Sequence, residues 1–572
     1  MTKTIMYEDK PWLKAYQAGI PECIDYEEIC LPDVLDRSAR EFPEGEALIF
    51  EGYTVTYTVL KEMVDRFATC LSAFGVGKGD AVAVLLPNLI PCVVAYYAIL
   101  KIGGVAVMTN PLYSDAELRH QFNNSGSKVL VTVDFLGDRM IDLRPKTKIK
   151  QIVYTSIGDY LPFLRNILFS LTAKIKKRAA DVKPAPDVYT WKGCMELYAP
   201  DPPSVKLDFE DVAMYQYTGG TTGVSKGVML THANLSTQVQ QLAAWFPAFA
   251  KGKGRPLGGL PFFHAFGLST AMNFSIYMGW ADILVPKPQS GPLLEAIRKF
   301  KPSFVVMVPT MYIGMLNDPD IKKTDMRCVK GCFSGSAPFS VEAMDKFEEI
   351  TGSFIVEGFG MTETSPVTHI NPFAKGERKV GSIGVPISDT LCRIVDLEDG
   401  VMDMPVGEPG ELIIKGPQVM KGYRDMPFET ADTLRDGWCY TGDIATMDDD
   451  GYFYITDHKK EMIISGGYNV YPIDVDEVFY ENPKVQEACA IGIPDPRRGE
   501  NIKVFVVLRE GKSATQEEMI EFCRGRLATY KLPTEVEFRD RLPKTETGKI
   551  LRKDLRKEEL DKRRGKRTVN DE

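Results

Sequence analysis

The stretch YTGGTTGVSKGVMLTH, residues 217–232, combines four glycines and four threonines with one serine and one lysine. Glycines let the backbone turn its N–H groups to one side, while hydroxyls and a lysine add donors and positive charge. Such a composition is typical of a loop that holds phosphate. The preceding VAMYQYT predicts a strand, and the following VMLTHANL leads into a helix. The stretch therefore predicts a phosphate loop on an ordered scaffold.

The order of the residues excludes the commonest phosphate loop. A Walker A loop needs GxxxxGK[ST], but Lys226 is followed by Gly227 and Val228. The one GKS sequence, at 511–513, has Val506 where the upstream glycine is required. The loop is instead expected to bind a polyphosphate through its own set of groups: Thr218, Gly219, Gly220, Thr221, Thr222, Gly223, Ser225 and Lys226.

Strand-like runs alternate with amphipathic stretches along the first 450 residues. The runs are rich in β-branched residues and apolar at nearly every position, as expected for parallel strands that helices cover on both faces. A helix-like stretch containing AELRHQFNNSG (116–126) separates two of them. The pattern predicts α/β layers in two subdomains, with strands at 81–87, 105–110, 129–133, 151–156, 282–287 and 303–310.

The pattern changes after about residue 390. Alternating apolar and polar residues in 393–400, 411–417 and 451–457, with turn signals such as DG and DDDG, predict antiparallel strands. A separate small α+β domain is expected from 461 to 572. The intervening DHKKE (457–461) is either a hinge or a solvated turn. The small domain should contain helices at 474–483 and 515–530 and strands at 486–494 and 502–508.

Three further stretches carry chemistry. In EGFGMTETSP (357–366), Thr362 and Glu363 place a hydroxyl beside a carboxylate, which suits Mg²⁺ bound to phosphate oxygens. In WCYTGDIA (438–445), Asp443 follows a Thr-Gly turn, where a carboxylate can accept both hydroxyls of a ribose. In RLPKTETGKILRKDL (541–555), Lys549 follows a glycine and can stabilise transferring charge. Each stretch alone is also compatible with an ordinary turn.

Together these segments resemble the adenylate-forming superfamily, which contains acyl-CoA synthetases, luciferases and the adenylation domains of peptide synthetases. The resemblance covers essentially the whole chain and is strongest to bacterial long-chain fatty-acyl-CoA synthetases. Besides the stretches above, it rests on SGSAP (334–338), GSIGVP (381–386), GELIIKGPQVMKGY (410–423), MIISGGYNVYP (462–472), GIPDPRRGE (492–500) and YKLP (530–533).

The resemblance implies an α/β fold with a large N-terminal domain and a mobile C-terminal α+β domain. The large domain, 1–456, would hold two layered α/β subdomains and a small β-barrel-like subdomain, and would bind AMP and the acyl group. Residues 457–461 would be the hinge, with Lys460 at the family's hinge position, and 462–572 would be the mobile domain.

The resemblance also implies the reaction. A carboxylate attacks the α-phosphate of Mg·ATP, which gives an acyl-adenylate and pyrophosphate, and the thiol of coenzyme A then displaces AMP. Lys549, Glu363 and Thr218 would be catalytic, with Glu363 and Thr218 also holding Mg²⁺. The loop 218–226 would hold the departing phosphates. The other nucleotide-binding residues would be Ser336, Ala337, Pro338, Glu357, Gly358, Phe359, Gly360, Met361, Thr362, Asp443, Ile455 and His458.

The acyl and coenzyme A sites are also inferred from the resemblance. PFFHAFGLS (261–269) matches the segment that lines the acyl pocket, although His264 could equally be a satisfied core histidine. The bulky phenylalanines here could enclose an alkyl chain or clasp a ring. The implied acyl residues are Phe263, His264, Phe266 and Gly335, and those for coenzyme A are Ser465, Gly466 and Gly467.

One position departs from the family pattern. Relatives usually have an arginine in the hinge motif, where this chain has His458. Histidine is shorter and usually neutral near pH 7, so a permanent cation is lost. The departure puts in doubt how tightly the nucleotide is held.

The sequence therefore predicts an AMP-forming acyl-CoA synthetase for a medium- or long-chain fatty acid. One alternative is a coenzyme A ligase for a cyclic acid such as benzoate or cyclohexanecarboxylate, including one that runs in reverse. A different class of protein, a membrane-associated acyl-binding or uptake protein, would use the basic stretch 160–181 as its membrane contact. That stretch is otherwise a surface helix.

The amino-acid composition limits the kinds of partner that this chain is expected to bind. The net charge of -9 and pI near 5.4 argue against a nucleic-acid-binding protein, because a phosphate backbone attracts a basic face. Scattered cysteines without a CxxC pair indicate a reducing compartment. We expect a cytoplasmic protein, with peripheral contact at the inner face of the membrane and a homodimer as open alternatives.

Overall fold

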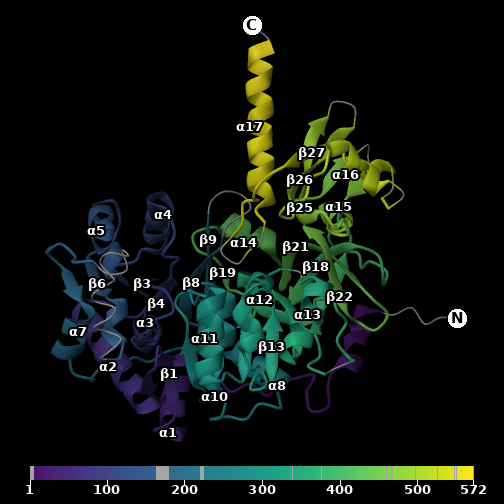
Figure 1. Ribbon diagram of the computed structural model, residues 1–572. Helices are drawn as coiled ribbons and strands as arrows, with labels where there is room; N and C mark the ends of the chain where they lie inside the picture. The colour runs from purple at the N-terminus through teal and green to yellow at the C-terminus, as the bar shows by residue number, and fades with distance from the viewer. Residues whose placement is uncertain are drawn as a thin grey trace. The chain divides into compact units, whose positions relative to one another are not determined.

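The computed structural model describes residues 6–162, 180–218, 225–337, 339–374, 376–458, 461–465, 468–495, 498–524, 526–527, 529–545, 548 and 550–570 (Figure 1). Its residues group into two compact units. One contains Ala15–Leu391 and Ile414–Cys439, and the other contains Met1–Lys14, Cys392–Ile413 and Tyr440–Glu572. Strands from 392–413 and 440–456 thus group with the C-terminal part. The predicted hinge at 457–461 stays a prediction.

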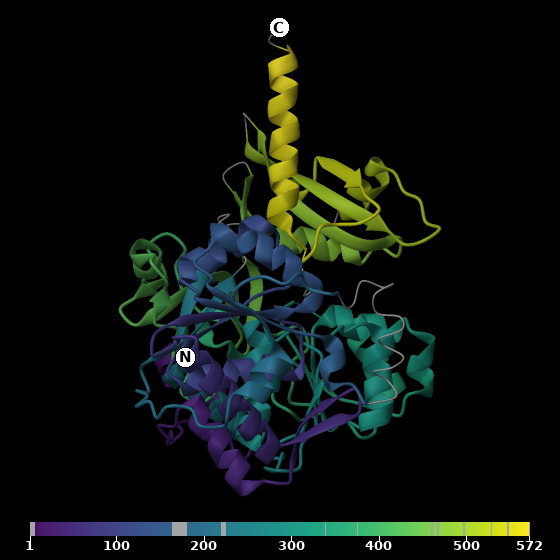
Figure 2. The same ribbon diagram turned by 90° about the vertical axis from the view of Figure 1, so that its left-hand side faces the viewer.

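The first sheet of the large unit has the strand order β19-β9-β8-β4-β3-β5-β6-β7. Alternate residues of its strands face opposite layers of helices, as period-two geometry requires. Ala81, Ala83 and Leu85 of β3 pack with α4 and α5, whereas Val82 and Val84 pack with α2 and α3 (Figures 1 and 2). The strands are β3 Ala81–Leu85, β4 Val105–Met108, β5 Val129–Val133, β6 Gln151–Thr155, β7 Val188–Thr190, β8 Val212–Thr218, β9 Lys226–Thr231 and β19 Gly422–Tyr423.

The second sheet of this unit has the order β16-β15-β14-β13-β12-β10-β11-β1-β2. Helices α11, α12 and α13 cover one of its faces (Figure 1), where Leu293, Tyr312 and Phe347 pack against Val305. The strands are β1 Glu46–Phe50, β2 Tyr53–Thr56, β10 Pro256–Gly258, β11 Asp282–Leu284, β12 Phe304–Met307, β13 Gly331–Ser334, β14 Ile355–Gly360, β15 Val367–Ile370 and β16 Val385–Pro386.

Several helices of the large unit begin at residues whose side chains cap them, as Thr56 does for α2 and Thr231 for α8. Ser114 and Glu117 form a capping box at the start of α4, which ends at the left-handed Gly126. The helices are α1 Leu31–Glu41, α2 Tyr57–Ala73, α3 Ile90–Lys101, α4 Asp115–Ser125, α5 Asp134–Leu143, α7 Trp191–Leu197, α8 His232–Trp245, α9 Ala265–Gly267, α10 Phe274–Met278, α11 Ser290–Phe300, α12 Pro309–Leu316, α13 Val341–Thr351 and α14 Pro427–Thr433. A π-helical stretch, Leu268–Asn273, joins α9 to α10.

A small antiparallel sheet follows residue 390, as the alternating pattern predicts. Its order is β17-β18-β21-β20, and β22 also pairs with β21. This sheet corresponds to the small β subdomain that the family resemblance implies. Its strands are β17 Leu391–Val395, β18 Gly410–Lys415, β20 Leu434–Arg435, β21 Trp438–Met447 and β22 Phe453–His458.

The C-terminal sheet has the order β24-β23-β26-β25, and β27 pairs in parallel with β26. The predicted helix at 515–530 is wrong in length, because α16 ends at Cys523 and Arg524 has an extended backbone. Gly525, a helix breaker, follows at once. The elements are β23 Ile463–Ser465, β24 Tyr468–Val470, α15 Pro472–Tyr480, β25 Val485–Asp495, β26 Gly499–Leu508, α16 Gln516–Cys523, β27 Glu535–Phe538 and α17 Arg552–Asn570.

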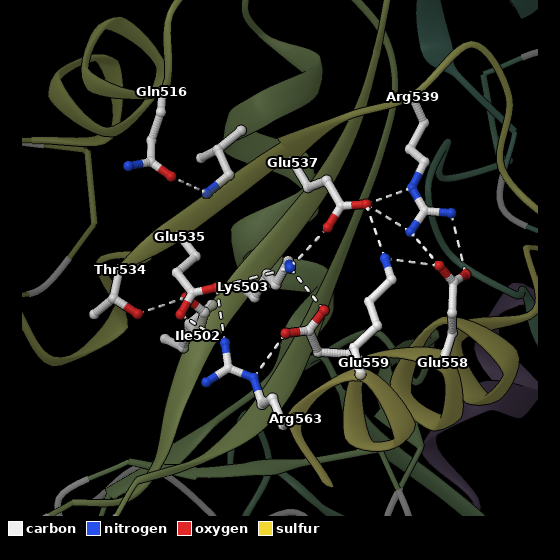
Figure 3. Close-up of polar contacts among 12 residues, drawn as sticks. Ile502, Lys503, Gln516, Thr534, Glu535, Glu537, Arg539, Glu558, Glu559 and Arg563 are labelled. Atoms are coloured by element: carbon white, nitrogen blue, oxygen red, sulfur yellow. Dashed lines mark hydrogen bonds and ion pairs between the residues drawn. The ribbon is translucent and has the colours of Figure 1, made fainter. Parts of the chain in front are cut away.

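A buried lysine fastens α17 to this sheet (Figure 3). Lys503 of β26 is 7% exposed, and its Nζ lies 2.8 Å from oxygens of both Glu559 on α17 and Glu537 on β27. Arg563 binds Glu559 and Glu535 in turn. Burial would lower the pKa of Lys503, but the glutamates raise it overall. The C-terminal helix is thus held by charge as well as by apolar packing.

No helix in the described part of the chain is long and apolar enough to span a membrane. Most of the basic stretch 160–181 lies outside the described residues, so its predicted membrane contact stays a prediction.

Candidate active site

The glycine-rich loop is flanked by a closed antiparallel hairpin. Thr218 at the end of β8 pairs with Lys226 at the start of β9. The hydroxyl of Ser225 donates to the carbonyl of Thr218 at 2.6 Å, and Nε2 of His120 lies 3.0 Å from the carbonyl of Ser225. Both ends of the predicted phosphate loop are therefore fixed in register.

Glu363 lies in a short 3-10 turn, Thr362–Thr364, directly after β14. Its carboxylate is buried at 7% exposure and accepts a hydrogen bond of 2.8 Å from the hydroxyl of Tyr423. The neighbouring Thr362 is half-buried. The predicted metal ligand is thus a fixed carboxylate beside a hydroxyl, the donor types that Mg²⁺ prefers.

Tyr423 is a site residue to which the sequence assigned no role. Its ring lies 4.8 Å from Nζ of Lys226, so it contacts both the phosphate-loop lysine and Glu363. Burial first, and then the charge of Glu363, raise the pKa of its phenol far above the ordinary value. Tyr423 is therefore a hydrogen-bond donor at neutral pH. The only available signal was its place in the PQVMKGY segment.

A small pocket brings together residues that the sequence assigned to two different ligands. Its wall includes acyl-site candidates from 264–266 and nucleotide-site candidates from 358–362. A shared wall is what a reaction between an acid and a nucleotide requires. The predicted residues that line it are His264, Phe266, Gly335, Ser336, Gly358, Phe359, Gly360, Met361 and Thr362.

His264 lies at the start of α9, where its Nδ1 accepts a hydrogen bond from the backbone N–H of Phe266 at 3.3 Å. Burial lowers its pKa to about 4, so the ring is neutral at pH 7 and carries its proton on Nε2. Phe263 does not line the pocket; its carbonyl accepts from the side-chain amide of Gln216 on β8. His264 is thus both a helix cap and a donor in the pocket wall.

Glu357, which is predicted for the nucleotide and precedes residues 358–362, does not line the pocket. Its carboxylate accepts backbone N–H groups of Phe339 at 3.2 Å and Gly381 at 3.3 Å. Burial raises its pKa to about 7, although these two donors and Arg378 act to lower it. The carboxylate therefore joins the segment that follows Ser336 and Ala337 to the loop at 381.

Two small residues explain the tight path of the pocket wall. A side chain at Gly360 would place its Cβ 1.9 Å from the carbonyl oxygen of Pro366, so only glycine fits there. A Cβ at Gly335 would lie 3.1 Å from Cζ of Phe266. Both positions let backbone and ring approach the pocket closely.

Other predicted nucleotide residues belong to the C-terminal compact unit. Asp443 of β21 pairs with His458 of β22, and Ala445 pairs with Ile455. Asp443 is 5% exposed and follows Gly442, whose φ of 74° needs the left-handed region. Ser465, predicted for coenzyme A, ends β23 and is buried. Asp443 and His458 are thus neighbours on adjacent strands.

Several predicted residues lie outside the described part of the chain, and their roles stay predictions. They are Gly219, Gly220, Thr221, Thr222, Gly223, Pro338, Lys460, Gly466, Gly467 and Lys549.

Comparison with protein families finds two matches along the chain. Residues 35–424 match the AMP-binding enzyme family, and residues 474–549 match the AMP-binding enzyme C-terminal domain. The first match alone covers more than half of the chain.

Full-length relatives agree with these matches. The long-chain-fatty-acid–CoA ligase of Bacillus subtilis (strain 168) is 44% identical over 558 residues, which cover 97% of this chain and 99% of the relative. The enzyme of the same name from Escherichia coli O6:H1 is 36% identical over 562 residues, with the same coverage. The crystal structure of ATP-bound MatB from Rhodopseudomonas palustris has a TM-score of 0.80 at 27% identity, covering 92% of this chain and 99% of MatB.

Proposed function

We propose that this chain, which belongs to the AMP-binding enzyme family, activates a medium- or long-chain fatty acid as an acyl-adenylate and transfers it to coenzyme A. The relatives that match nearly its full length are named long-chain-fatty-acid–CoA ligases, and together with the AMP-binding family match this name supports ATP-dependent, AMP-forming acyl-CoA synthesis. The fatty acid is the finer part of the proposal, and the names of those relatives support it.

The pocket shared by His264, Phe266 and residues 358–362 is the observation that carries the proposal. An acid whose carboxylate lies at His264 would meet the donor on Nε2, while the apolar wall at Phe266 and Phe333 would contact its first carbons. The same wall continues into the segment 358–362 predicted for the nucleotide. The carboxylate and the α-phosphate would therefore meet within one site.

In the first half-reaction a carboxylate oxygen attacks the α-phosphorus of ATP, and the bond to the β-phosphate breaks to release pyrophosphate. The loop 218–226, between the paired strands β8 and β9, would hold the departing phosphates. Lys549 would neutralise charge between the carboxylate and the α-phosphate. Such a transfer depends on positioning and charge stabilisation rather than on a covalent enzyme group.

The residues around Glu363 fit a magnesium ion. A buried carboxylate held by Tyr423 and a hydroxyl at Thr362 are hard oxygen donors on a fixed turn. Glu363 would bind the ion, with Thr218 as the second predicted ligand. When bound, the ion would neutralise the charge of the phosphate oxygens.

In the second half-reaction the thiolate of coenzyme A attacks the acyl carbonyl carbon and AMP leaves. We propose that the segment 465–467 contacts coenzyme A and that residues 462–572 move about Lys460 between the two steps. Motions of this kind separate half-reactions in many enzymes.

A panel of acids tests the substrate. AMP release would be measured with acetate, octanoate, palmitate, benzoate and cyclohexanecarboxylate, each with and without coenzyme A. The proposal expects the highest kcat/KM for octanoate or palmitate and a requirement for coenzyme A. Preference for benzoate or cyclohexanecarboxylate would make the chain a cyclic-acid ligase. Pyrophosphate release without consumption of coenzyme A would make it an acyl-AMP ligase.

Two proposed partners need separate tests. Flotation with anionic vesicles would report contact through 160–181, and sedimentation would report a homodimer. If vesicle binding persisted while Lys549→Ala left cellular fatty-acid uptake unchanged, an acyl-uptake protein would replace the enzyme proposal.

A further inference from the structure

The segment Met420–Arg424 joins the two parts of the site that handle negative charge. Its strand β19 pairs antiparallel with β9, the strand that Lys226 begins, with Tyr423 opposite Val228. Arg424 N–H donates to the carbonyl of Gly227 at 2.7 Å. At the other end, Met420 N–H donates to the carbonyl of Glu363 at 2.8 Å. Five consecutive residues thus bridge the phosphate hairpin and the turn that carries Glu363.

Helices α8 and α14 anchor this segment and the residues just before it. The side-chain amide of Asn234, on the buried helix α8, donates to the carbonyls of Pro417 and Val419 at 2.9 and 2.8 Å. The hydroxyl of Thr430 on α14 accepts the N–H of Tyr423 at 2.9 Å. The backbone of Tyr423 is therefore held by Thr430 and by the pairing of β19 with β9, independently of its side chain.

The side chain of Tyr423 lies between two groups of opposite charge. Its hydroxyl donates to Oε1 of Glu363 at 2.8 Å, and the face of its ring lies 4.8 Å from Nζ of Lys226. Tyr423 is only 6% exposed, so both contacts are made away from bulk water. Hydrogen bonds to a carboxylate and contacts of an ammonium with a ring are both strengthened by such burial.

We propose that Tyr423 is a positioning residue that orients the Glu363 carboxylate toward the metal and Lys226 toward the phosphates, and so couples metal binding to the grip on pyrophosphate. The inference rests on the proposed function of the site. Glu363 lies on the turn after β14 and Lys226 begins β9, and one aromatic side chain contacts both. Loss of the hydroxyl should therefore loosen the carboxylate without removing the support under the lysine.

The variant Tyr423→Phe separates the two contacts. It keeps the ring under Lys226 and removes only the donor to Glu363. Because loss of a group that orients a metal ligand costs about 10- to 100-fold in metal affinity, we expect Mn²⁺·ATP to bind about tenfold more weakly in calorimetry. The Mg²⁺ concentration for half-maximal acid-dependent ATP–pyrophosphate exchange should rise by a similar factor. The KM for the fatty acid should not change.

Tyr215→Phe is the matched control. Tyr215 is also buried and lies on β8 of the same sheet, one strand beyond β9, and its hydroxyl accepts from Arg424 at 2.7 Å rather than contacting Glu363. It should lose a hydroxyl with no change in the metal requirement. If Tyr423→Phe and Tyr215→Phe lower Tm alike and leave Mn²⁺·ATP affinity alike, Tyr423 is only structural and the proposal is overturned.

A second pair of variants tests the coupling directly. In a Glu363→Gln background the hydroxyl of Tyr423 no longer faces a carboxylate, so adding Tyr423→Phe should not weaken Mn²⁺·ATP further. The proposal would be contradicted if Tyr423→Phe weakened Mn²⁺·ATP binding by the same factor with and without Glu363→Gln. Tyr423→Leu, which also removes the ring, should weaken pyrophosphate binding about fivefold beyond Tyr423→Phe, as loss of a cation–ring contact suggests. Equal pyrophosphate binding by the two variants would refute the role toward Lys226.

Different results would contradict the proposed function and the proposed role of Tyr423. If the unaltered protein shows no acid-dependent ATP–pyrophosphate exchange, the proposed function is wrong. If it shows exchange while Tyr423→Phe has unaltered metal dependence and Mn²⁺·ATP affinity, only the role of Tyr423 is wrong.

Discussion

A buried aspartate outside the site should impose a pH dependence on folding that a single substitution removes. Asp282 begins β11, between β1 and β10, and is 1% exposed. Within the described part of the chain, neither of its carboxylate oxygens has a hydrogen-bond partner. The nearby hydroxyl of Tyr57 donates instead to the carbonyls of Ser275 and Trp280. Burial raises the pKa of Asp282 from 3.8 to about 8.

The sign follows from the proton balance. Below about pH 4 the carboxyl is neutral in both folded and unfolded chains, so its titration adds no cost there. Between pH 4 and 8 the unfolded chain releases the proton that the folded chain keeps, so the free energy of unfolding falls by about 1.4 kcal/mol per pH unit. At pH 7 the accumulated cost is about 4 kcal/mol. Above pH 8 it stays constant.

Asp282→Asn keeps the shape and removes the titration. Its buried amide still lacks partners, which costs about 1–3 kcal/mol at every pH, so the slope is the diagnostic quantity. Urea unfolding should be followed by tryptophan fluorescence at pH 5, 6, 7 and 8. The free energy of unfolding of the variant, relative to that of the unaltered protein, should rise by about 4 kcal/mol from pH 5 to 8. Asp345→Asn, at an exposed position on α13, should show no such trend. A constant difference for Asp282→Asn from pH 5 to 8 would refute the reasoning.

Three further predictions concern the pocket, the nucleotide and the C-terminal unit. Gly335→Val presses on Phe266 and should raise the KM for palmitate about tenfold while sparing acetate; equal effects on both acids would contradict the assigned acyl wall. His458→Arg introduces the permanent cation of the family pattern and should lower the KM for ATP about threefold in steady-state assays. An unchanged or raised KM would contradict the interpretation that His458 weakens nucleotide binding. Lys503→Met removes the buried ammonium from its glutamates and should lower the free energy of unfolding of the C-terminal unit in urea by about 3 kcal/mol. Lys503→Arg should retain most of that free energy. If Lys503→Met left the free energy of unfolding unchanged, apolar packing alone would hold α17.

The strands of the large unit could be predicted because burial on both faces leaves a continuous apolar run. The predicted strand at 129–133 agrees with β5, whereas 105–110 and 303–310 extend past β4 and β12. After β4 the extra residues, Thr109 and Asn110, are polar, whereas after β12 Val308 continues the apolar run and Pro309 already begins α12. Composition marks where a strand lies in the core, but backbone hydrogen bonds decide where it ends.

Most of the predicted pocket residues came from the family resemblance, and composition alone pointed only to the segment around Thr362. Glycines and hydroxyls in 357–366 are unusual enough to be noticed, and the structure brings 358–362 and 264–266 to one wall. The role of Tyr423 could not be predicted from composition, because one tyrosine in an apolar segment has no compositional signature of its own. Its role depends on β19 pairing with β9 and on the turn at Glu363, which lie far apart in sequence.

A physical reason explains why this site depends on residues that hold its loops without lining its pocket. A loop rich in glycine can approach a phosphate or a pocket closely, but it has few side chains with which to fix its own conformation. Other segments must therefore hold it, as the Glu357 carboxylate does for the backbone at Phe339 and Gly381, and as Tyr423 does for Glu363. Substitutions at these supports should change how well ligands are positioned while every contacting residue remains in place. A search for the determinants of activity in this chain should begin with them.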